Sequence, residues 1–97
     1  MLTIENGPNG VVVLVGRLDS AQSAAAQSFL DGLQGSVTLD CRGLEYISSA
    51  GLGAFLKTQK RLMASAGKLR LVGVNHHLRD IFQYSGFDQI FEIEPLE

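Results

Sequence analysis

The chain has 97 residues, a formal net charge of −2 and a 45% share of hydrophobic residues. This is the length of one globular domain, with too little apolar surface for a second core or a deep cleft. Its eight Lys and Arg residues are scattered along the chain, which argues against a nucleic-acid-binding protein. We therefore expect a single domain spanning residues 1–97, with another protein as its main ligand.

The N-terminal residues 1–5 have no basic start and no long apolar run, unlike a signal peptide. No stretch of the sequence approaches the ~20 apolar residues of a membrane span. We therefore predict a cytoplasmic protein that does not contact a membrane. The single cysteine, Cys41, excludes an internal disulfide and is expected to be a buried thiol.

The first part of the chain predicts a hairpin, a helix and a strand. Residues 2–5 and the β-branched run 11–15 flank a segment rich in Asn and Gly, which is typical of a hairpin. The run 11–15 is apolar on both of its faces and predicts a central strand of the sheet. A helix follows, with Asp19 or Ser20 as its N-cap, and residues 36–40 predict the next strand.

The second part alternates helices with strands. Residues 41–47 are expected to cross to the longest helix, which begins within 48–51. A strand at 68–72, a short helix capped by Asn75 and a strand at 90–93 follow. The expected apolar stripe of the long helix comprises Leu52, Phe55, Leu56, Leu62, Met63 and Ala66, and Tyr84 and Phe87 are expected at the edge of the core. This order predicts an α/β fold with a mixed, mostly parallel sheet of four to five strands and three to four helices.

The segment Ser48-Ser49-Ala50-Gly51-Leu52-Gly53 stands where the longest helix begins. The N–H groups of a first helical turn and the helix dipole favour an anion. A serine in this place is most often an N-cap, which contributes about 1 kcal/mol. A cap needs only one hydroxyl and no glycine, yet this segment has two serines, and each of its two glycines disfavours a helix by about 1 kcal/mol relative to Ala. The pattern indicates that another molecule or segment approaches closely here.

Three blocks of the sequence resemble the STAS family, the anti-sigma factor antagonists. Residues 46–53 (Tyr-Ile-Ser-Ser-Ala-Gly-Leu-Gly), which follow the strand Val-Thr-Leu-Asp of residues 37–40, are similar to the family signature. Residues 16–19 (Gly-Arg-Leu-Asp) resemble its earlier Gly-x-Leu-Asp element, and residues 78–87 resemble its third block. The three blocks occur in the family's order and spacing, so the resemblance covers essentially the whole chain.

The resemblance implies that Ser49, two residues before Gly51, is the phosphoacceptor. The family's usual Asp before this serine is Ser48 here, and the usual Ser or Thr after it is Ala50. The implied partner-binding surface comprises Asp19, Ser48, Ser49, Ala50, Gly51 and Leu52, with Asp40 and Gly53 as structural support. Asp40 is expected to position the loop before Ser48. Asp19 has two open interpretations, which are compatible: an N-cap of the first helix, and an acidic contact to a basic residue of the partner.

By the same resemblance, unmodified Ser49 lies on a surface that docks a serine kinase which is also the anti-sigma factor, and docking frees the sigma factor. Phosphorylation adds about −1.5 to −2 charge at pH 7, which is expected to release the partner without refolding the domain. A PP2C-type metal-dependent phosphatase would reset the switch. Two alternatives remain open: a constitutively binding STAS subunit of an ABC-type lipid or solute transporter, and a partner switch with a non-sigma output such as secretion or biofilm formation.

Motifs of catalysis and of metal binding are not recognisable. The two serines lack the leading glycine of a nucleophile elbow. Residues 51–53 (Gly-Leu-Gly) lack the third glycine of a dinucleotide-binding loop and the lysine of a P-loop. His76 and His77 are adjacent, and adjacent residues of a helix do not face each other, so a paired metal site is not expected. We predict a protein that is not an enzyme and has no metal or other cofactor.

Overall fold

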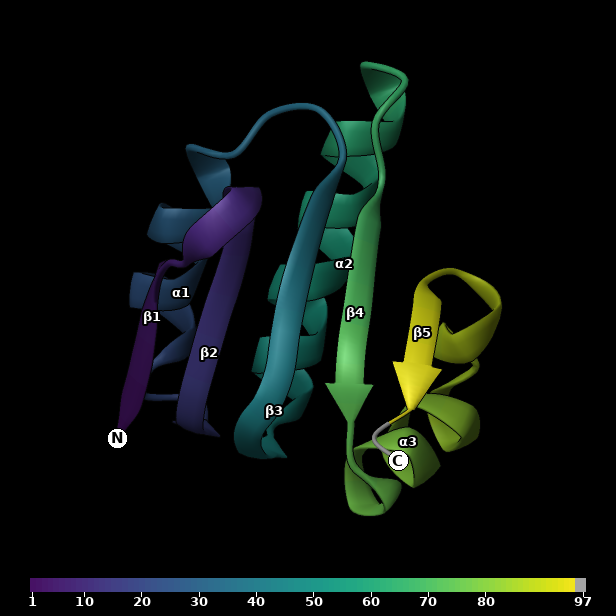
Figure 1. Ribbon diagram of the computed structural model, residues 1–97. Helices are drawn as coiled ribbons and strands as arrows, with labels where there is room; N and C mark the ends of the chain where they lie inside the picture. The colour runs from purple at the N-terminus through teal and green to yellow at the C-terminus, as the bar shows by residue number, and fades with distance from the viewer. Residues whose placement is uncertain (96–97) are drawn as a thin grey trace.

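The fold is built on one five-stranded sheet, shown in Figure 1 by the computed structural model, which describes residues 1–95. The strands lie in the order β1-β2-β3-β4-β5. They are β1 (Leu2–Asn6), β2 (Val11–Leu18), β3 (Val37–Ile47), β4 (Leu69–Val74) and β5 (Glu92–Pro95). β1 pairs with β2 in antiparallel orientation, and all the later pairs are parallel. The predicted mixed, mostly parallel sheet is confirmed.

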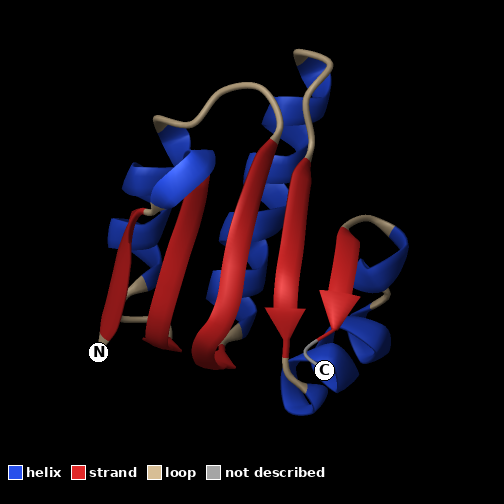
Figure 2. Ribbon diagram, viewed as in Figure 1, coloured by secondary structure: helices blue, strands red, loops and turns tan. Residues whose placement is uncertain are grey.

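Three α-helices connect the parallel strands: α1 (Ser23–Asp31), α2 (Ser49–Ala64) and α3 (His76–Ser85). Figure 2 shows α1 and α2 on the same face of the sheet, with α3 near the ends of β4 and β5. Two 3-10 turns, η1 (Pro8–Gly10) and η2 (Phe87–Gln89), precede β2 and β5. No helix formed by residues 1–95 has the length and apolar character needed to cross a membrane.

The core lies between the sheet and helices α1 and α2. Every second side chain of a strand points to the same face, and on the helix-covered face Leu14, Leu39 and Leu71 are completely buried. From the helices, Leu30 and Phe55 are equally buried in the same cluster. Burial of a side chain of this size contributes about 1.5–3 kcal/mol, so these contacts fix α1 and α2 on this face.

The opposite face of the sheet is open. Val11 and Val13 are only half-buried on this face, and Val15 is 48% exposed. The run 11–15 forms an inner strand of the sheet, between β1 and β3, as predicted, but one face of this apolar strand is not covered by a helix. Its β-branched residues indicated a strand correctly, but the apolar run could not reveal that both large helices pack on the same side.

Strand β3 is longer than predicted. Residues 41–47, which were expected to cross to the helix, form its second half and pair with β2 as far as Ile47 opposite Leu18. The mixed composition of this short segment does not predict a strand. Its extended conformation is stabilised by the backbone hydrogen bonds of parallel pairing with β2. Asp40 therefore lies in the first half of β3, not at its carboxyl end.

The helix boundaries and the outer apolar residues also differ from the prediction. α1 begins at Ser23, after a turn that contains the predicted caps. Met63 is 57% exposed, and Ala66 lies beyond the end of α2 with a left-handed φ of 63°. Figure 1 shows the last turn of α2 projecting past the sheet, where no core can cover it. Tyr84, expected at the edge of the core, is 93% exposed, and Ile90 precedes β5 rather than belonging to it.

Two polar side chains of α2 connect it to its neighbours. The Arg61 guanidinium donates to the carbonyl oxygens of Leu30 and Leu33, at 2.9 and 2.7 Å, and so satisfies the C-terminal end of α1. The buried Gln59 amide accepts from the Leu69 N–H at 2.6 Å and donates to the Ile90 carbonyl at 2.8 Å. Gln59 therefore holds α2 against the start of β4 and the segment before β5.

Candidate functional site

Parallel pairing of β2 and β3 brings two of the predicted blocks together. Leu18 lies opposite Ile47 in the strand register. The Ser48 N–H donates to the Leu18 carbonyl oxygen at 2.8 Å. Asp19 follows Leu18 in the chain and Ser49 follows Ser48, so both lie where the carboxyl ends of neighbouring parallel strands meet. Binding sites of α/β sheets form at this edge.

The two serines at the start of α2 have different roles. Ser48 is the N-cap: its backbone is extended, and its Oγ accepts a hydrogen bond from the Gly51 N–H at 3.1 Å. Ser49 is the first residue of the helix and is exposed. Its hydroxyl forms no hydrogen bond with any side chain or backbone group of residues 1–95. One serine thus supplies the cap, and the other presents a free hydroxyl beside the N–H groups of the first turn.

The residues after Ser49 divide between the surface and the core. Ala50 and Gly53 are exposed, whereas Gly51 and Leu52 are buried. A Cβ at Gly51 would lie 2.8 Å from Leu18 Cγ, so the glycine lets α2 approach the strand end closely. A Cβ at Gly53 would meet no atom within 4 Å. The predicted close approach occurs inside the fold at Gly51, whereas Gly53 leaves the outer side of the helix without a side chain.

Asp19 caps a turn that precedes α1. Its Oδ1 accepts a hydrogen bond from the Gln22 N–H at 3.1 Å, and Gln22 itself occupies the N-cap position of α1. The Asp19 side chain is half-buried, and its second oxygen has no hydrogen bond within residues 1–95. The expected cap of the helix is thus a cap of the turn before it, made by one of the two carboxylate oxygens.

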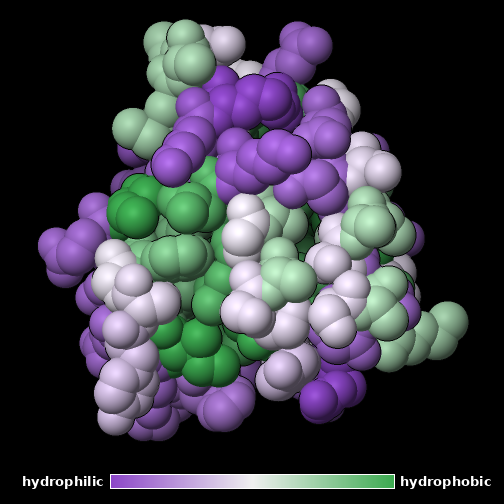
Figure 3. Space-filling model, turned by 180° about the vertical axis from the view of Figure 1, so that it is seen from behind, coloured by the Kyte–Doolittle hydropathy of each residue, from purple (hydrophilic) through white to green (hydrophobic). Residues whose placement is uncertain are grey.

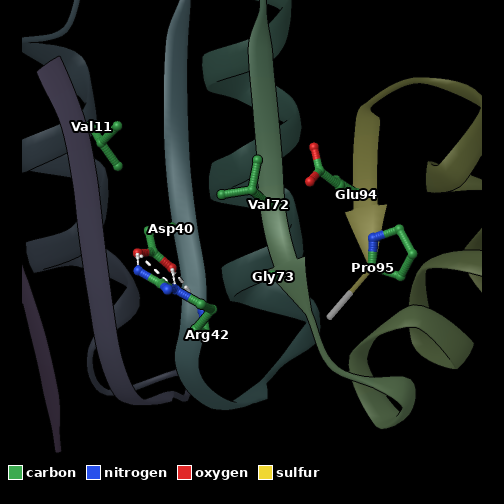
Figure 4. Close-up of a pocket in the computed structure, with 7 residues that line it drawn as sticks. All are labelled: Val11, Asp40, Arg42, Val72, Gly73, Glu94 and Pro95. Atoms are coloured by element: carbon green, nitrogen blue, oxygen red, sulfur yellow. Dashed lines mark hydrogen bonds and ion pairs between the residues drawn. The ribbon is translucent and has the colours of Figure 1, made fainter. Parts of the chain in front are cut away.

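Asp40 does not lie near the serines. It stands on the open face of the sheet, eight residues before Ser48 along an extended strand, which is roughly 25 Å at about 3.3 Å per residue. Figure 4 shows it paired with Arg42 in a shallow hollow. The hollow has a volume of about 430 Å³ and is lined by Val11, Asp40, Arg42, Val72, Gly73, Glu94 and Pro95. The expectation that Asp40 positions the loop before Ser48 was wrong, because β3 continues as far as Ile47.

A bidentate salt bridge joins Asp40 to Arg42. Arg42 Nη2 donates to Oδ2 at 2.7 Å, and Nε donates to Oδ1 at 3.0 Å. The hydrogen bonds from Arg42 hold the pKa of Asp40 below its ordinary 3.8, although burial acts in the opposite direction. Between these residues, burial and the Asp40 charge raise the pKa of the Cys41 thiol to about 12. Cys41 is therefore a protonated, buried thiol, as its apolar neighbours led us to expect.

Replacing Asp40 by Asn is expected to lower the free energy of unfolding by about 1 kcal/mol at neutral pH, a small effect because Arg42 is well exposed. The folded-state pKa of Asp40 lies below its unfolded value. The carboxylate therefore stabilises the fold above pH 3.8, and this contribution is lost as the pH falls through the folded-state pKa. Urea denaturation of both proteins should show a constant stability gap above pH 3.8 that closes in acid. A gap that widens in acid would contradict the assignment.

One feature beside the site was not evident from the sequence. The Arg17 guanidinium stacks on the Tyr46 ring, 4.4 Å from its centroid. The two residues are partners in the β2–β3 register, next to the Leu18–Ile47 pair. They are far apart in the chain, so only correct strand register could have paired them. The stack holds a cation beside the edge that carries Asp19 and Ser49.

The sequence and the fold have counterparts among known proteins. The sequence profile described as "Mlab, STAS domain" matches residues 2–95. BtrV of Bordetella bronchiseptica, assigned as an anti-sigma factor antagonist, is 36% identical over 87 residues, which cover 86% of this chain and 75% of BtrV.

Solved structures agree with this relationship. A protein of Thermotoga maritima, assigned as an anti-sigma factor antagonist, superposes with a TM-score of 0.78 and 20% identity over 96% of this chain and 85% of its own. The Bacillus protein SpoIIAA superposes in its unphosphorylated form with a TM-score of 0.71 and 19% identity over 100% of this chain and 90% of its own. Its phosphorylated form gives 0.69 and 22% over 96% and 90%.

The structural likenesses, at 22% identity or less, establish the fold. The profile match and the 36% identity to BtrV establish the family. The resemblance found in the three sequence blocks is thereby confirmed. The chain belongs to the STAS family of anti-sigma factor antagonists, which are regulatory binding proteins rather than enzymes.

Proposed function

We propose that this protein binds an anti-sigma factor when Ser49 is unmodified and releases it when Ser49 is phosphorylated. The proposal rests on one observation: Ser48 caps α2, whereas Ser49 has an exposed hydroxyl. Ser48 supplies the N-cap through its bond to Gly51, so Ser49 can be modified without loss of the cap. Its exposed hydroxyl is accessible to a kinase at the edge of the sheet.

Electrostatics explains why modification would change binding more than folding. A phosphate on Ser49 adds about −1.5 to −2 charge, and the N-terminus of α2 favours a negative charge locally. A partner surface formed against a neutral hydroxyl would have to desolvate that charge, at a cost of several kcal/mol when it is left poorly paired. The superposition of both forms of SpoIIAA on this chain supports a fold that tolerates the phosphate.

The partners that fit this proposal are an anti-sigma factor with serine kinase activity and a PP2C-type phosphatase, acting in the cytoplasm. Asp19 would contribute its unpaired carboxylate oxygen to a basic residue of the partner. Ala50 and Gly53 would leave room for the partner's backbone. The protein itself would be a substrate and ligand, with no catalytic role and no cofactor.

Two other functions are compatible with the fold: a constitutive STAS subunit of an ABC-type lipid or solute transporter, and a partner switch with a non-sigma output. The free hydroxyl of Ser49 favours a phosphorylation switch over a constitutive subunit. The identity of the neighbouring genes would separate the sigma-linked and non-sigma outputs.

The direct test is phosphorylation of the purified protein by its candidate kinase with ATP, followed by mass-spectrometric mapping. We expect one phosphate on Ser49, none on the Ser49→Ala variant, and an intact reaction with Ser48→Ala. The last variant loses its cap and about 1 kcal/mol of stability but keeps the acceptor. Modification of Ser48 in place of Ser49, or no modification by a kinase that binds the protein, would refute the proposal.

A further inference from the structure

The sheet divides where strands β3 and β4 separate. Their register ends with Asp40 opposite Val72, and beyond this pair β3 continues beside β2, and β4 beside β5. Both strands contain an extra residue at this level: β3 between Asp40 and Gly43 relative to β2, and β4 at Gly73 relative to β5. An inserted residue bends its strand. The two bends therefore lie side by side, where the paired strands part.

The side chain of Arg42 lies against Gly73 at this point of separation. Gly73 has a left-handed φ of 68°, which glycine adopts without strain. A Cβ at this position would lie 2.2 Å from Arg42 Cγ and 3.3 Å from the Arg42 backbone nitrogen. Figure 4 shows Arg42 on β3 beside Gly73 on β4, with the guanidinium turned toward Asp40. The stem of Arg42 thus fills the space that any other residue at position 73 would need.

Asp40 keeps this stem in place. Its carboxylate accepts from Arg42 Nε and Nη2 at the far end of the side chain, and from the Arg42 backbone N–H at 3.1 Å. Asp40 itself is only 8% exposed, so the carboxylate is fixed by its surroundings. Because Cγ lies between the two ends that Asp40 binds, the stem can leave Gly73 only if the salt bridge breaks.

Two residues after Gly73, Asn75 joins the start of α3 to β3 again. Asn75 Nδ2 donates to the Leu44 carbonyl oxygen at 3.1 Å, and Oδ1 accepts from the Leu78 N–H at 2.9 Å. One side chain thus caps α3 and ties it to the second half of β3. Leu44 lies beyond the last β3–β4 pair, so Asn75 reaches it only because β4 bends at Gly73.

Apolar packing places the rest of α3 but not its first turn. Leu78 and Phe82 are completely buried in the core cluster. Figure 3, which views the helix-covered side, shows hydrophobic side chains gathered in one area of that side. His76 and His77, in the first turn, are exposed. The position of the first turn therefore depends on Asn75 and on the bend that precedes it.

We propose that Arg42, held by Asp40, acts as a wedge against Gly73 that sets where β3 and β4 separate and so positions the first turn of α3. Since β2, β3 and β4 are parallel neighbours, this turn follows the Ser49 segment along one edge of the sheet. The inference needs only the fold and is independent of the proposed function. A salt bridge that merely added stability would act equally with any residue at position 73, whereas the wedge needs glycine there.

The test is a double-mutant cycle on the full chain, measured by urea denaturation. Gly73→Ala should raise the unfolding equilibrium constant about 100-fold, about tenfold from the left-handed φ and about tenfold from the contact with Arg42. In the Arg42→Ala background the same change should cost only about tenfold, because Cγ is gone. Gly10→Ala is the matched control: its φ is 74° and its Cβ would meet no atom within 4 Å. It should cost about tenfold with either residue at position 42.

Amide hydrogen exchange of the Arg42→Ala variant, followed by NMR, tests the effect on α3. The Leu78 N–H, which Asn75 caps, should gain about tenfold more in exchange rate than the Leu30 N–H of α1. Equal costs of Gly73→Ala in the two backgrounds would overturn the wedge. Equal changes at Leu78 and Leu30 would overturn the positioning of α3. The exchange measurement keeps Gly73 unchanged, so it decides the inference even if Gly73→Ala fails to fold.

Discussion

Phosphorylation of Ser49 is expected to weaken binding to the anti-sigma factor by at least about 100-fold, close to 3 kcal/mol. The cause is a doubly charged group placed where the partner meets a neutral hydroxyl, at the exposed first residue of α2. Ser49→Asp carries half that charge and should weaken binding about tenfold. Ser49→Ala should bind as tightly as the unmodified protein, because the hydroxyl forms no internal hydrogen bond. Isothermal titration calorimetry of the four forms gives these values directly.

Two observations would decide against this mechanism. Equal affinity of the phosphorylated and unmodified forms would show that the modified serine lies outside the interface. A large loss in the melting temperature on phosphorylation would show that the charge unfolds the helix start instead of repelling the partner. Ser48→Ala serves as the control, since it removes the cap bond to Gly51 and leaves the acceptor unchanged.

The two glycines of the signature are expected to respond in opposite directions. Gly51→Leu should lower the free energy of unfolding by about 2–3 kcal/mol, because even its Cβ would lie within 3 Å of Leu18 and Ile47 side chains in a packed layer. Gly53→Ala should raise it by up to about 1 kcal/mol, because the position is helical and its Cβ meets open space. Urea denaturation measures both changes in the same helix.

Each glycine variant is the control for the other. Neither Gly51 nor Gly53 has a positive φ, and neither lies in a turn. If both variants lost stability, both positions would need glycine for their backbone conformation, contrary to this prediction. Binding of the Gly53→Ala variant adds information about the surface. A more stable protein with weaker binding would show that the partner approaches the bare side of α2 at this position.

Much of the architecture could be predicted from local patterns. The turn chemistry before Val11, the cap at Asn75 and the alternation of helical and strand segments are determined by neighbouring residues. The Asn75 side chain does accept from the Leu78 N–H at 2.9 Å. The ends of strands and helices were harder to predict from the sequence. The second half of β3, for example, is extended because it pairs with β2. The prediction for Met63 failed because periodicity identifies one face of a helix, and the last turn of α2 projects past the sheet, where no core covers that face.

The sequence by itself determined the order of elements, the family and the serine pair at the start of the longest helix. Each of these depends on short local patterns, and the family depends also on the order and spacing of three such patterns along the chain. Only the tertiary structure decided which serine caps α2, that Asp19 and Ser49 lie at the same edge of the sheet, and that Asp40 lies far from both. It also decided the stacking of Arg17 on Tyr46 and the meeting of α2 with Ile90. Such relations depend on the strand register and on which face of the sheet the helices cover. Local residue patterns predict neither the register nor the covered face.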